Sequence, residues 1–253
     1  MVKLTRIYTR TGDAGTTRLS DNSETAKTDP RVQAYGHVDE ANSMIGVVLT
    51  QPGLSDDIAA VLTHVQNELF DCGADLSNPL QADESNTLRV IEPYVSRLES
   101  WCDQYSQDLP DLPSFVLPGG TPASAWLQVA RTVVRRAERT GWAAASVYGN
   151  QPAADGRPGG VNLLALAYLN RLSDLLFILA RVAGQPNAEV LWVPGKDRQA
   201  PDPTAIRSSR EHAARPNVDS ESDPESPTAS EPTTDAQPPT AAEEETSNEK
   251  PAE

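Results

Sequence analysis

Five stretches of the chain place apolar residues at helical spacing, and this periodicity constrains the fold more than any other feature. In the first stretch, Val38, Ala41, Ile45 and Val48 recur three or four residues apart. Such residues lie on one face of a helix, which must be buried against other helices. The pattern predicts helices over about residues 31–50, 54–75, 88–108, 122–145 and 161–182, the fourth with Thr121 as its N-cap. Because no segment alternates like a strand, we expect an all-α, five-helix bundle.

The composition changes near residue 200. Residues 201–253 contain 13 acidic and 4 basic residues, 9 of the 21 prolines and no aromatic residue. Such a segment buries too little apolar surface to offset the entropy lost on folding, about 1–2 kcal/mol per residue for the backbone. We therefore predict one helical domain over residues 1–200 and a disordered, acidic, proline-rich tail over residues 201–253.

Polar residues on the fourth predicted helix form a stripe of Gln128, Arg131, Arg135 and Glu138, with spacings of 3, 4 and 3. The opposite side, which includes Trp126, is available for the core. Two arginines one turn apart repel each other, so an anion should compensate them. A solvated face neutralised by carboxylates is one interpretation, and a site for phosphate or carboxylate groups is the other. Spacing does not decide between them.

Two further polar features need partners. In the last predicted helix, Asn170, Arg171 and Asp174 interrupt an otherwise apolar sequence, and their partners are neighbouring helices or a ligand. Near the start of the chain, residues 9–17 read TRTGDAGTT. Its glycines, threonines and the downstream Lys27 suit an anion-binding loop, and they suit a tight surface turn equally well. The Lys of a Walker loop and its surrounding βαβ pattern are missing.

Several other classes of protein are disfavoured. The three histidines do not cluster as zinc ligands, and the Glu-x-x-His pattern of ferritin-like di-iron bundles does not occur. We therefore expect no metal bound by side chains. The net charge of −15 argues against a nucleic-acid-binding protein. The N-terminus does not read as a signal peptide, and no run approaches the ~18 apolar residues of a membrane span. These features predict a cytoplasmic protein without a membrane partner.

Five segments in matching order resemble the PduO-type ATP:corrinoid adenosyltransferases. They read TRTGDAGTT, VQAYGHVDEANSMIG, FVLPGG, ARTVVRRAER and YLNRLSDLLFILAR, and the likeness covers about residues 4–194. The resemblance implies a homotrimer of five-helix bundles with active sites between subunits. It also implies an enzyme that transfers the 5′-deoxyadenosyl group of ATP to cob(I)alamin, with Mg²⁺ on the ATP, giving adenosylcobalamin and triphosphate.

The resemblance also assigns residues. Phe115 would occupy the lower face of the corrin, and Asp39 would pair with Arg131 across the subunit interface. Arg135 would stabilise the leaving triphosphate, so these four residues form the implied catalytic set. The residues implied for ATP binding are Thr9, Arg10, Thr11, Gly12, Gly15, Thr16, Thr17, Lys27, Arg135, Glu138 and Asn170.

The sequence departs from the family pattern in three places. Gln128 stands where many relatives have histidine, the loop over residues 147–162 is longer than usual, and the acidic tail has no counterpart. An alternative function is an adenosylcobalamin-binding module that delivers the cofactor to a mutase with little catalysis of its own. A cobalamin reductase and such a mutase are the expected protein partners.

Overall fold

The computed structural model describes residues 8–185, 189–200 and 202. The described residues up to Arg198 belong to one compact unit. Apart from Asp202, the predicted tail lies outside the described residues. The elements are, in chain order, β1 (Thr16–Arg18), β2 (Glu24–Ala26), α1 (Pro30–Leu49), α2 (Asp56–Leu76), α3 (Glu92–Ser106), α4 (Pro122–Tyr148) and α5 (Leu163–Gly184).

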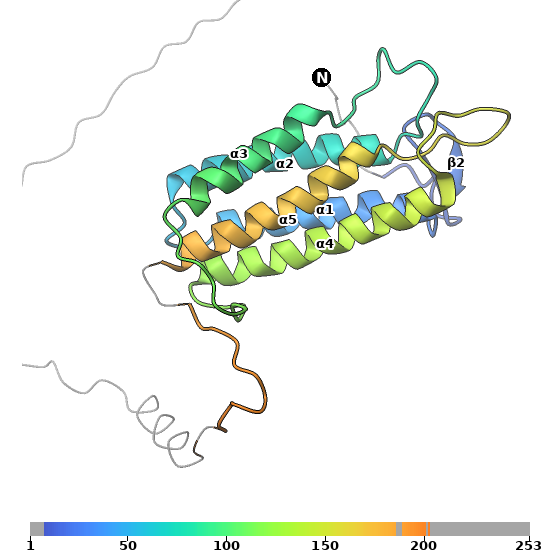
Figure 1. Cartoon of the computed structure of the whole chain (residues 1–253). Coiled ribbons are helices and arrows are strands. Elements are labelled where there is room, and N and C mark those ends of the chain that lie inside the picture. Colours follow the sequence, from blue (N-terminus) through green and yellow to red (C-terminus); the bar gives the residue numbers. More distant parts are fainter. Residues whose placement is uncertain (1–7, 186–188, 201, 203–253) are drawn as a thin grey trace, which may run out of the picture. The chain divides into compact units, whose positions relative to one another are not determined.

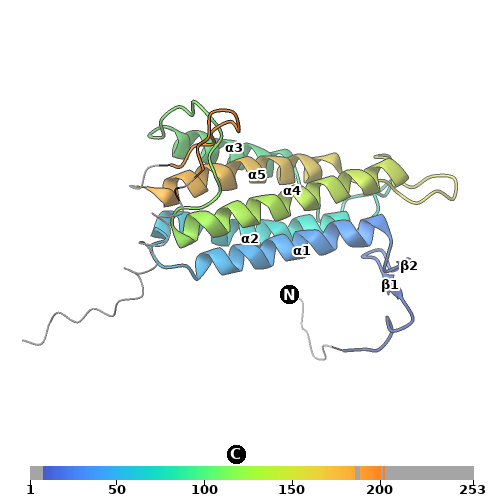
Figure 2. The same cartoon turned by 90° about the horizontal axis from the view of Figure 1, so that it is seen from below.

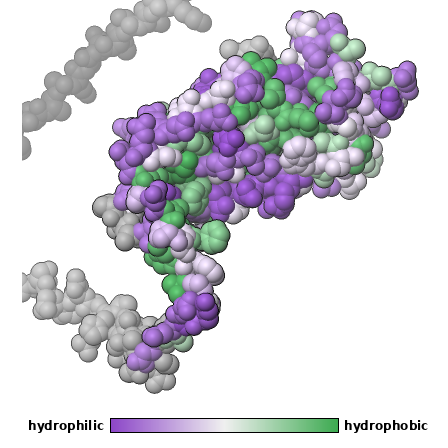
Figure 3. Space-filling model, in the orientation of Figure 1, coloured by the Kyte–Doolittle hydropathy of each residue, from purple (hydrophilic) through white to green (hydrophobic). Residues whose placement is uncertain are grey.

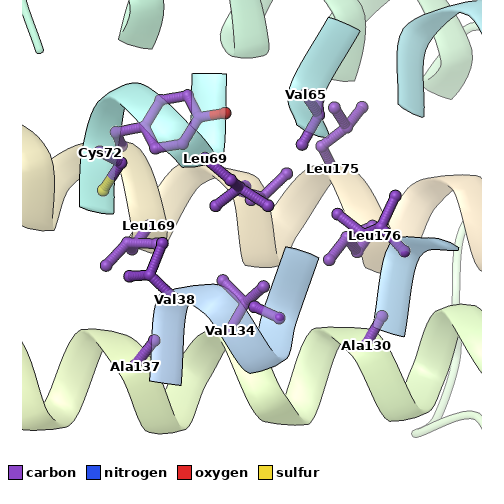
Figure 4. Close-up of a cluster of buried hydrophobic side chains, with 14 of the residues drawn as sticks. Val38, Val65, Leu69, Cys72, Ala130, Val134, Ala137, Leu169, Leu175 and Leu176 are labelled. Atoms are coloured by element: carbon purple, nitrogen blue, oxygen red, sulfur yellow. The ribbon is translucent and has the colours of Figure 1, made fainter. Parts of the chain in front are cut away.

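The five helices run side by side as a bundle, which confirms the predicted fold (Figure 1). The predicted apolar stripes form its core. Side chains from the first, second, fourth and fifth helices, including Val38, Leu69, Val134 and Leu176, point toward one another there (Figure 4). All four are buried to 1% exposure or less. Burying one such side chain contributes roughly 1.5–3 kcal/mol, so packing and not helix propensity holds the bundle together.

Two details of the sequence-based prediction are wrong. First, β1 and β2 form a short antiparallel hairpin in which Thr17 pairs with Thr25, whereas no strand was expected. Second, α3 begins at Glu92 and not near Leu88. The buried carboxylate of Asp75 accepts hydrogen bonds from the Val90 backbone N–H (2.7 Å) and from Arg89 Nη1 (2.8 Å). These bonds hold the residues before α3 outside the helix.

Specific contacts fix both ends of α4. At its start, Thr121 Oγ1 accepts from the Ser124 N–H (3.1 Å) and donates to the Ala183 carbonyl at the end of α5 (2.8 Å). This confirms the predicted N-cap, which Pro122 follows at the first helical position. At its end, the Tyr148 hydroxyl donates to the carboxylate of Asp29, the N-cap of α1. The helices α1 and α4 are therefore antiparallel neighbours.

Among the described residues, one helix, α5, is long and apolar enough to cross a membrane by length and composition alone. The sequence analysis did not anticipate this. Of its most apolar window, 56% is buried inside the bundle, which is the behaviour of a central core helix. Its leucines pack against the other helices, including Leu169 and Leu176 in Figure 4.

Candidate active site

The N-terminal loop is held together by its own contacts and by Lys27. Gly15 adopts φ +88°, a conformation that favours glycine, and its carbonyl accepts from the Lys27 backbone N–H at 2.9 Å. A Cβ atom on Gly12 would lie only 3.1 Å from Lys27 Nζ. The ammonium group therefore lies directly over the loop, as the anion-binding interpretation requires.

A cavity opens on this loop. It is lined by Thr11, Gly12, Thr16, Thr17, Arg18 and Glu24. Hydroxyl groups and a nearby ammonium can bind a polyphosphate, and the carboxylate of Glu24 adds an acidic group at the edge. The turn also has a structural role, because residues 16 and 17 form β1. Both interpretations of the loop thus have support from its geometry.

On the other side of the site, α4 and α5 bring three predicted residues together. Asn170 Nδ2 donates to Glu138 Oε1 at 3.2 Å, and Arg135 Nη1 lies 3.5 Å from Ser173 Oγ. Arg135 itself is exposed. The two helices can approach here because Gly141, one turn further on, has no side chain against Leu166. The polar residues of α5 therefore pair partly with α4.

Arg131 continues this face toward the start of α4. Its Nε donates to Gln128 Oε1 at 2.8 Å, and its guanidinium lies 6.0 Å from the centre of the Phe177 ring. Burial, together with the positive charge of Arg135, lowers the pKa of Arg131. Among the described residues, no carboxylate forms an ion pair with either arginine. Within the described residues, the stripe thus presents two arginines without an ion-pair partner, and its Glu138 is hydrogen-bonded to Asn170.

One prediction for α4 was wrong in detail. Trp126, placed in the core, is 37% exposed. Gln128 lies on the predicted stripe beside Arg131 but is only 5% exposed, and it lines a cavity together with residues before α4 and after α5. The neighbour Arg136 forms an ion pair with Glu40 of α1, so the carboxylate compensation expected for a solvated face does occur, but at a different arginine.

Asp39 lies on α1, is exposed and forms no ion pair within the described parts of the chain. A single subunit does not bring it to Arg131. The pairing expected from the family resemblance would need a second copy of the chain.

Phe115 marks the apolar end of the site. Its ring is 78% exposed and meets the Trp192 ring edge to face, with centroids 6.1 Å apart. The backbones on either side pair as a short antiparallel bridge, with the Trp192 N–H donating to the Phe115 carbonyl at 2.7 Å. Arg181 supports this arrangement by binding both Glu189 (2.7 Å) and the Pro110 carbonyl (2.7 Å). Hydrophobic surface is visible at this end of the bundle (Figure 3).

These aromatic residues line a cavity of about 710 Å³ whose other walls include Gln128 and Arg131. Phe177 and Trp192 are lining residues that the sequence analysis missed. The only signal for Trp192 was a large aromatic residue in the extended LWVPG segment after the last helix. Its pairing with residue 115 is a long-range contact that periodicity cannot predict.

The two halves of the site lie at opposite ends of the bundle. The hairpin and N-terminal loop adjoin the start of α1, whereas the loop carrying residue 115 adjoins the start of α4 (Figure 2). A helix of the 27 residues of α4 is about 40 Å long. No hydrogen bond or ion pair joins residues 9–15 to α4 or α5 within the described residues.

No group of three or more His, Cys, Asp and Glu side chains that could hold a metal ion occurs among the described residues. The polar groups of the site are mainly hydroxyls, amides and cations, with the separate carboxylates of Glu24 and Glu138. Such groups suit the binding of a polyanion together with its own metal ion.

Comparison with known proteins places these features in a family. The family model described as cobalamin adenosyltransferase matches residues 7–183. A corrinoid adenosyltransferase from Mycobacterium tuberculosis is 56% identical over 200 residues, which cover 79% of this chain and 98% of that protein. The corresponding enzyme from Bacillus subtilis is 41% identical over 181 residues, covering 70% of this chain and 86% of that protein.

The solved structures agree. A variant of the PduO-type ATP:corrinoid adenosyltransferase from Lactobacillus reuteri, complexed with cobalamin and ATP, superimposes with a TM-score of 0.64 at 35% identity. The match covers 74% of this chain and 99% of that one. Both the matched length and the identity are far beyond a shared fold alone. The chain therefore belongs to the cobalamin adenosyltransferase family.

Proposed function

We infer that the protein transfers the 5′-deoxyadenosyl group of ATP to the cobalt of a corrinoid, releasing triphosphate. The observation that carries this inference is the pair Arg131 and Arg135, which form no ion pair with a described carboxylate, beside the aromatic cavity of Phe115. The two arginines suit the binding of a polyanion, and the adjoining aromatic cavity suits a large apolar ring. A single-substrate phosphatase or a purely structural bundle would not need both.

The reaction defines what the side chains must do. Co(I) attacks the 5′ carbon of ATP, the Co–C bond forms, and the electron pair of the breaking C–O bond stays on the triphosphate oxygen. The nucleophile is the metal of the substrate, so the protein needs no general base. It must hold the two substrates in line and stabilise the charge on the leaving group.

We propose that Arg135, Lys27 and the hydroxyls of the N-terminal loop bind the triphosphate. In support, Lys27 lies over the loop and Arg135 has no carboxylate partner among the described residues. Mg²⁺ would enter with the phosphates. Glu138 and Asn170, already joined by a hydrogen bond, would contact the nucleoside part of ATP.

Phe115 would cover the lower face of the corrin. An apolar ring there excludes water and displaces the lower axial ligand, which makes cob(II)alamin easier to reduce because no ligand then donates into the cobalt orbital that accepts the electron. Its large exposure supports this role, since a ring that contributes to the core would be buried.

We further propose that the active unit is a homotrimer with each site between two subunits. Two observations support it: the loop and Phe115 lie at opposite ends of one bundle, and Asp39 forms no ion pair with any described residue of its own chain. A cytoplasmic location, a reductase that supplies the electron and a mutase that accepts the product remain predictions of the same kind.

A spectrophotometric assay tests the function directly. Protein, ATP, Mg²⁺ and chemically reduced cobalamin are mixed, and the cob(I)alamin absorption is followed. We expect it to disappear with formation of a light-sensitive product. A protein that binds adenosylcobalamin but does not consume cob(I)alamin would favour the delivery module instead.

A further inference from the structure

Gln128 is a buried amide whose orientation the structure fixes. The residue is 5% exposed and lies on α4, one turn before Arg131. The Arg131 Nε group lies 2.8 Å from the Gln128 side chain, and a guanidinium can only donate hydrogen bonds. The facing atom must therefore be the oxygen, Oε1. This assignment turns the amide nitrogen, Nε2, away from Arg131.

The amide nitrogen has no hydrogen-bond partner among the described residues. Among the described residues, two side-chain atoms are fully enclosed and also lack a hydrogen-bond partner, namely Asn42 Oδ1 and Arg136 Nε. Gln128 Nε2 also lacks a partner but does not belong to this set, so it is not fully enclosed. It must reach open space. Gln128 lines two cavities, the aromatic one of about 710 Å³ and a smaller one of about 260 Å³ behind Val116.

A donor left without a partner at a largely buried position is costly, so a ligand or water should pair with it. The aromatic cavity is where the proposed function places the lower face of the corrin. Corrins carry propionamide side chains on that face, and each ends in a carbonyl that accepts hydrogen bonds. The apolar walls from Phe115, Phe177 and Trp192 suit the ring itself. Gln128 is the amide donor in that wall.

We infer that Gln128 Nε2 donates a hydrogen bond to the carbonyl of a lower-face propionamide of the corrinoid, and so acts as a specificity-determining residue. The inference rests on the proposed function. Because Arg131 engages Oε1, Gln128 offers only a donor at this position. It therefore accommodates an amide carbonyl or a carboxylate, and it gives no hydrogen bond to the amide NH₂.

Three substitutions separate the donor from the contact with Arg131. Gln128→Glu keeps an oxygen toward Arg131 but replaces the donor with an acceptor. Gln128→Leu removes both groups. Gln128→His keeps both in its neutral form, since one ring nitrogen accepts and the other donates. Gln104→Glu, on the exposed side of α3, is the matched control for the added negative charge.

The measurements are the dissociation constant of cob(II)alamin with ATP present, the dissociation constant of ATP alone, and the oligomeric state. For Gln128→Glu we expect corrinoid binding about tenfold weaker or more, with ATP binding and assembly unchanged. Gln128→Leu should weaken corrinoid binding similarly, and Gln128→His should retain it. Cobalamin derivatives in which one lower-face propionamide is hydrolysed to a carboxylate identify which corrin side chain Gln128 binds. The derivative with the carboxylate at that position should bind the Gln128→Glu variant still more weakly than cobalamin does, and it should not show this loss with the unaltered protein.

Unchanged corrinoid binding in Gln128→Glu would overturn the inference and place Nε2 in the smaller cavity. If ATP binding and corrinoid binding were weakened equally, or if the subunits no longer assembled, the inference would also be overturned, because Gln128 would then act only through Arg131. If the unaltered protein bound no corrinoid at all, the proposed function itself would fail, which is a distinguishable result.

Discussion

Replacing Gly141 by alanine tests how closely α4 and α5 approach beside the site. An added Cβ atom would lie less than 3.0 Å from Leu166 Cδ2 and 3.7 Å from Cγ. Leu166 is fully buried, so it has little room to move. Overpacking of this kind costs typically 1–3 kcal/mol, while alanine gains about 1 kcal/mol over glycine in helix propensity. We expect a net loss of about 1 kcal/mol and a Tm lower by roughly 2–4 °C.

The same substitution should have the opposite sign once Leu166 is shortened. Leu166→Ala alone should cost about 2–5 kcal/mol through the cavity that it leaves. In that background the methyl group of Gly141→Ala has space, and only the gain of about 1 kcal/mol in propensity remains. The two substitutions should therefore couple by about 2 kcal/mol, well above the deviation expected for independent sites.

The assay is denaturant unfolding of all four proteins, followed by circular dichroism at one protein concentration. A Gly141→Ala protein that is more stable in both backgrounds would refute the close approach. Activity gives a second readout. Glu138 lies one turn from Gly141 and binds Asn170, so moving the helices apart should also raise the KM for ATP.

Three further outcomes are expected. Arg135→Ala should reduce turnover by at least about a hundredfold with less than about 1 kcal/mol change in stability, because the side chain is exposed; an unfolded or fully active variant would contradict its role. Phe115→Ala should slow adenosylation from cob(II)alamin more than from pre-reduced cob(I)alamin, and equal effects in the two assays would argue against the lower-face position. Burial and the hydrogen bond to Asp29 raise the pKa of Tyr148 to about 12, so its contribution to stability is complete below pH 10 and is lost as pH rises through about 12. Unfolding measured from pH 8 to 12 should show this loss in the unaltered protein and a smaller one in Tyr148→Phe.

The helices could be predicted from the sequence because each buries a continuous apolar stripe, as Val38 and Val134 illustrate. Their boundaries could be predicted where the cap is local, as at Thr121. The start of α3 could not, since it depends on Asp75, which lies 15 residues before Val90 in the chain. Hydrogen bonds between residues distant in the chain therefore set where α3 begins, although the local apolar spacing would extend the helix further toward its N-terminus.

The candidate site divides in the same way. Arg131, Arg135 and Glu138 could be identified because one helix holds them on one face. The position of Trp192 could not, because a backbone bridge between distant segments sets it. The hairpin was also missed, since three-residue strands are too short to show alternation. The burial of Gln128 could not be predicted, because the sequence does not show which loops lie beside the start of α4.

For the proposed homotrimer, the separation of Lys27 from Arg135 along the bundle implies that two defective proteins can restore each other's activity. Chains with Lys27→Ala would supply an intact α4, and chains with Arg135→Ala would supply an intact loop. In trimers assembled from equal amounts of both chains, about a quarter of the sites would contain an intact N-terminal loop from one subunit and an intact α4 from its neighbour. Activity would then appear on mixing and reassembly, although neither preparation has it alone.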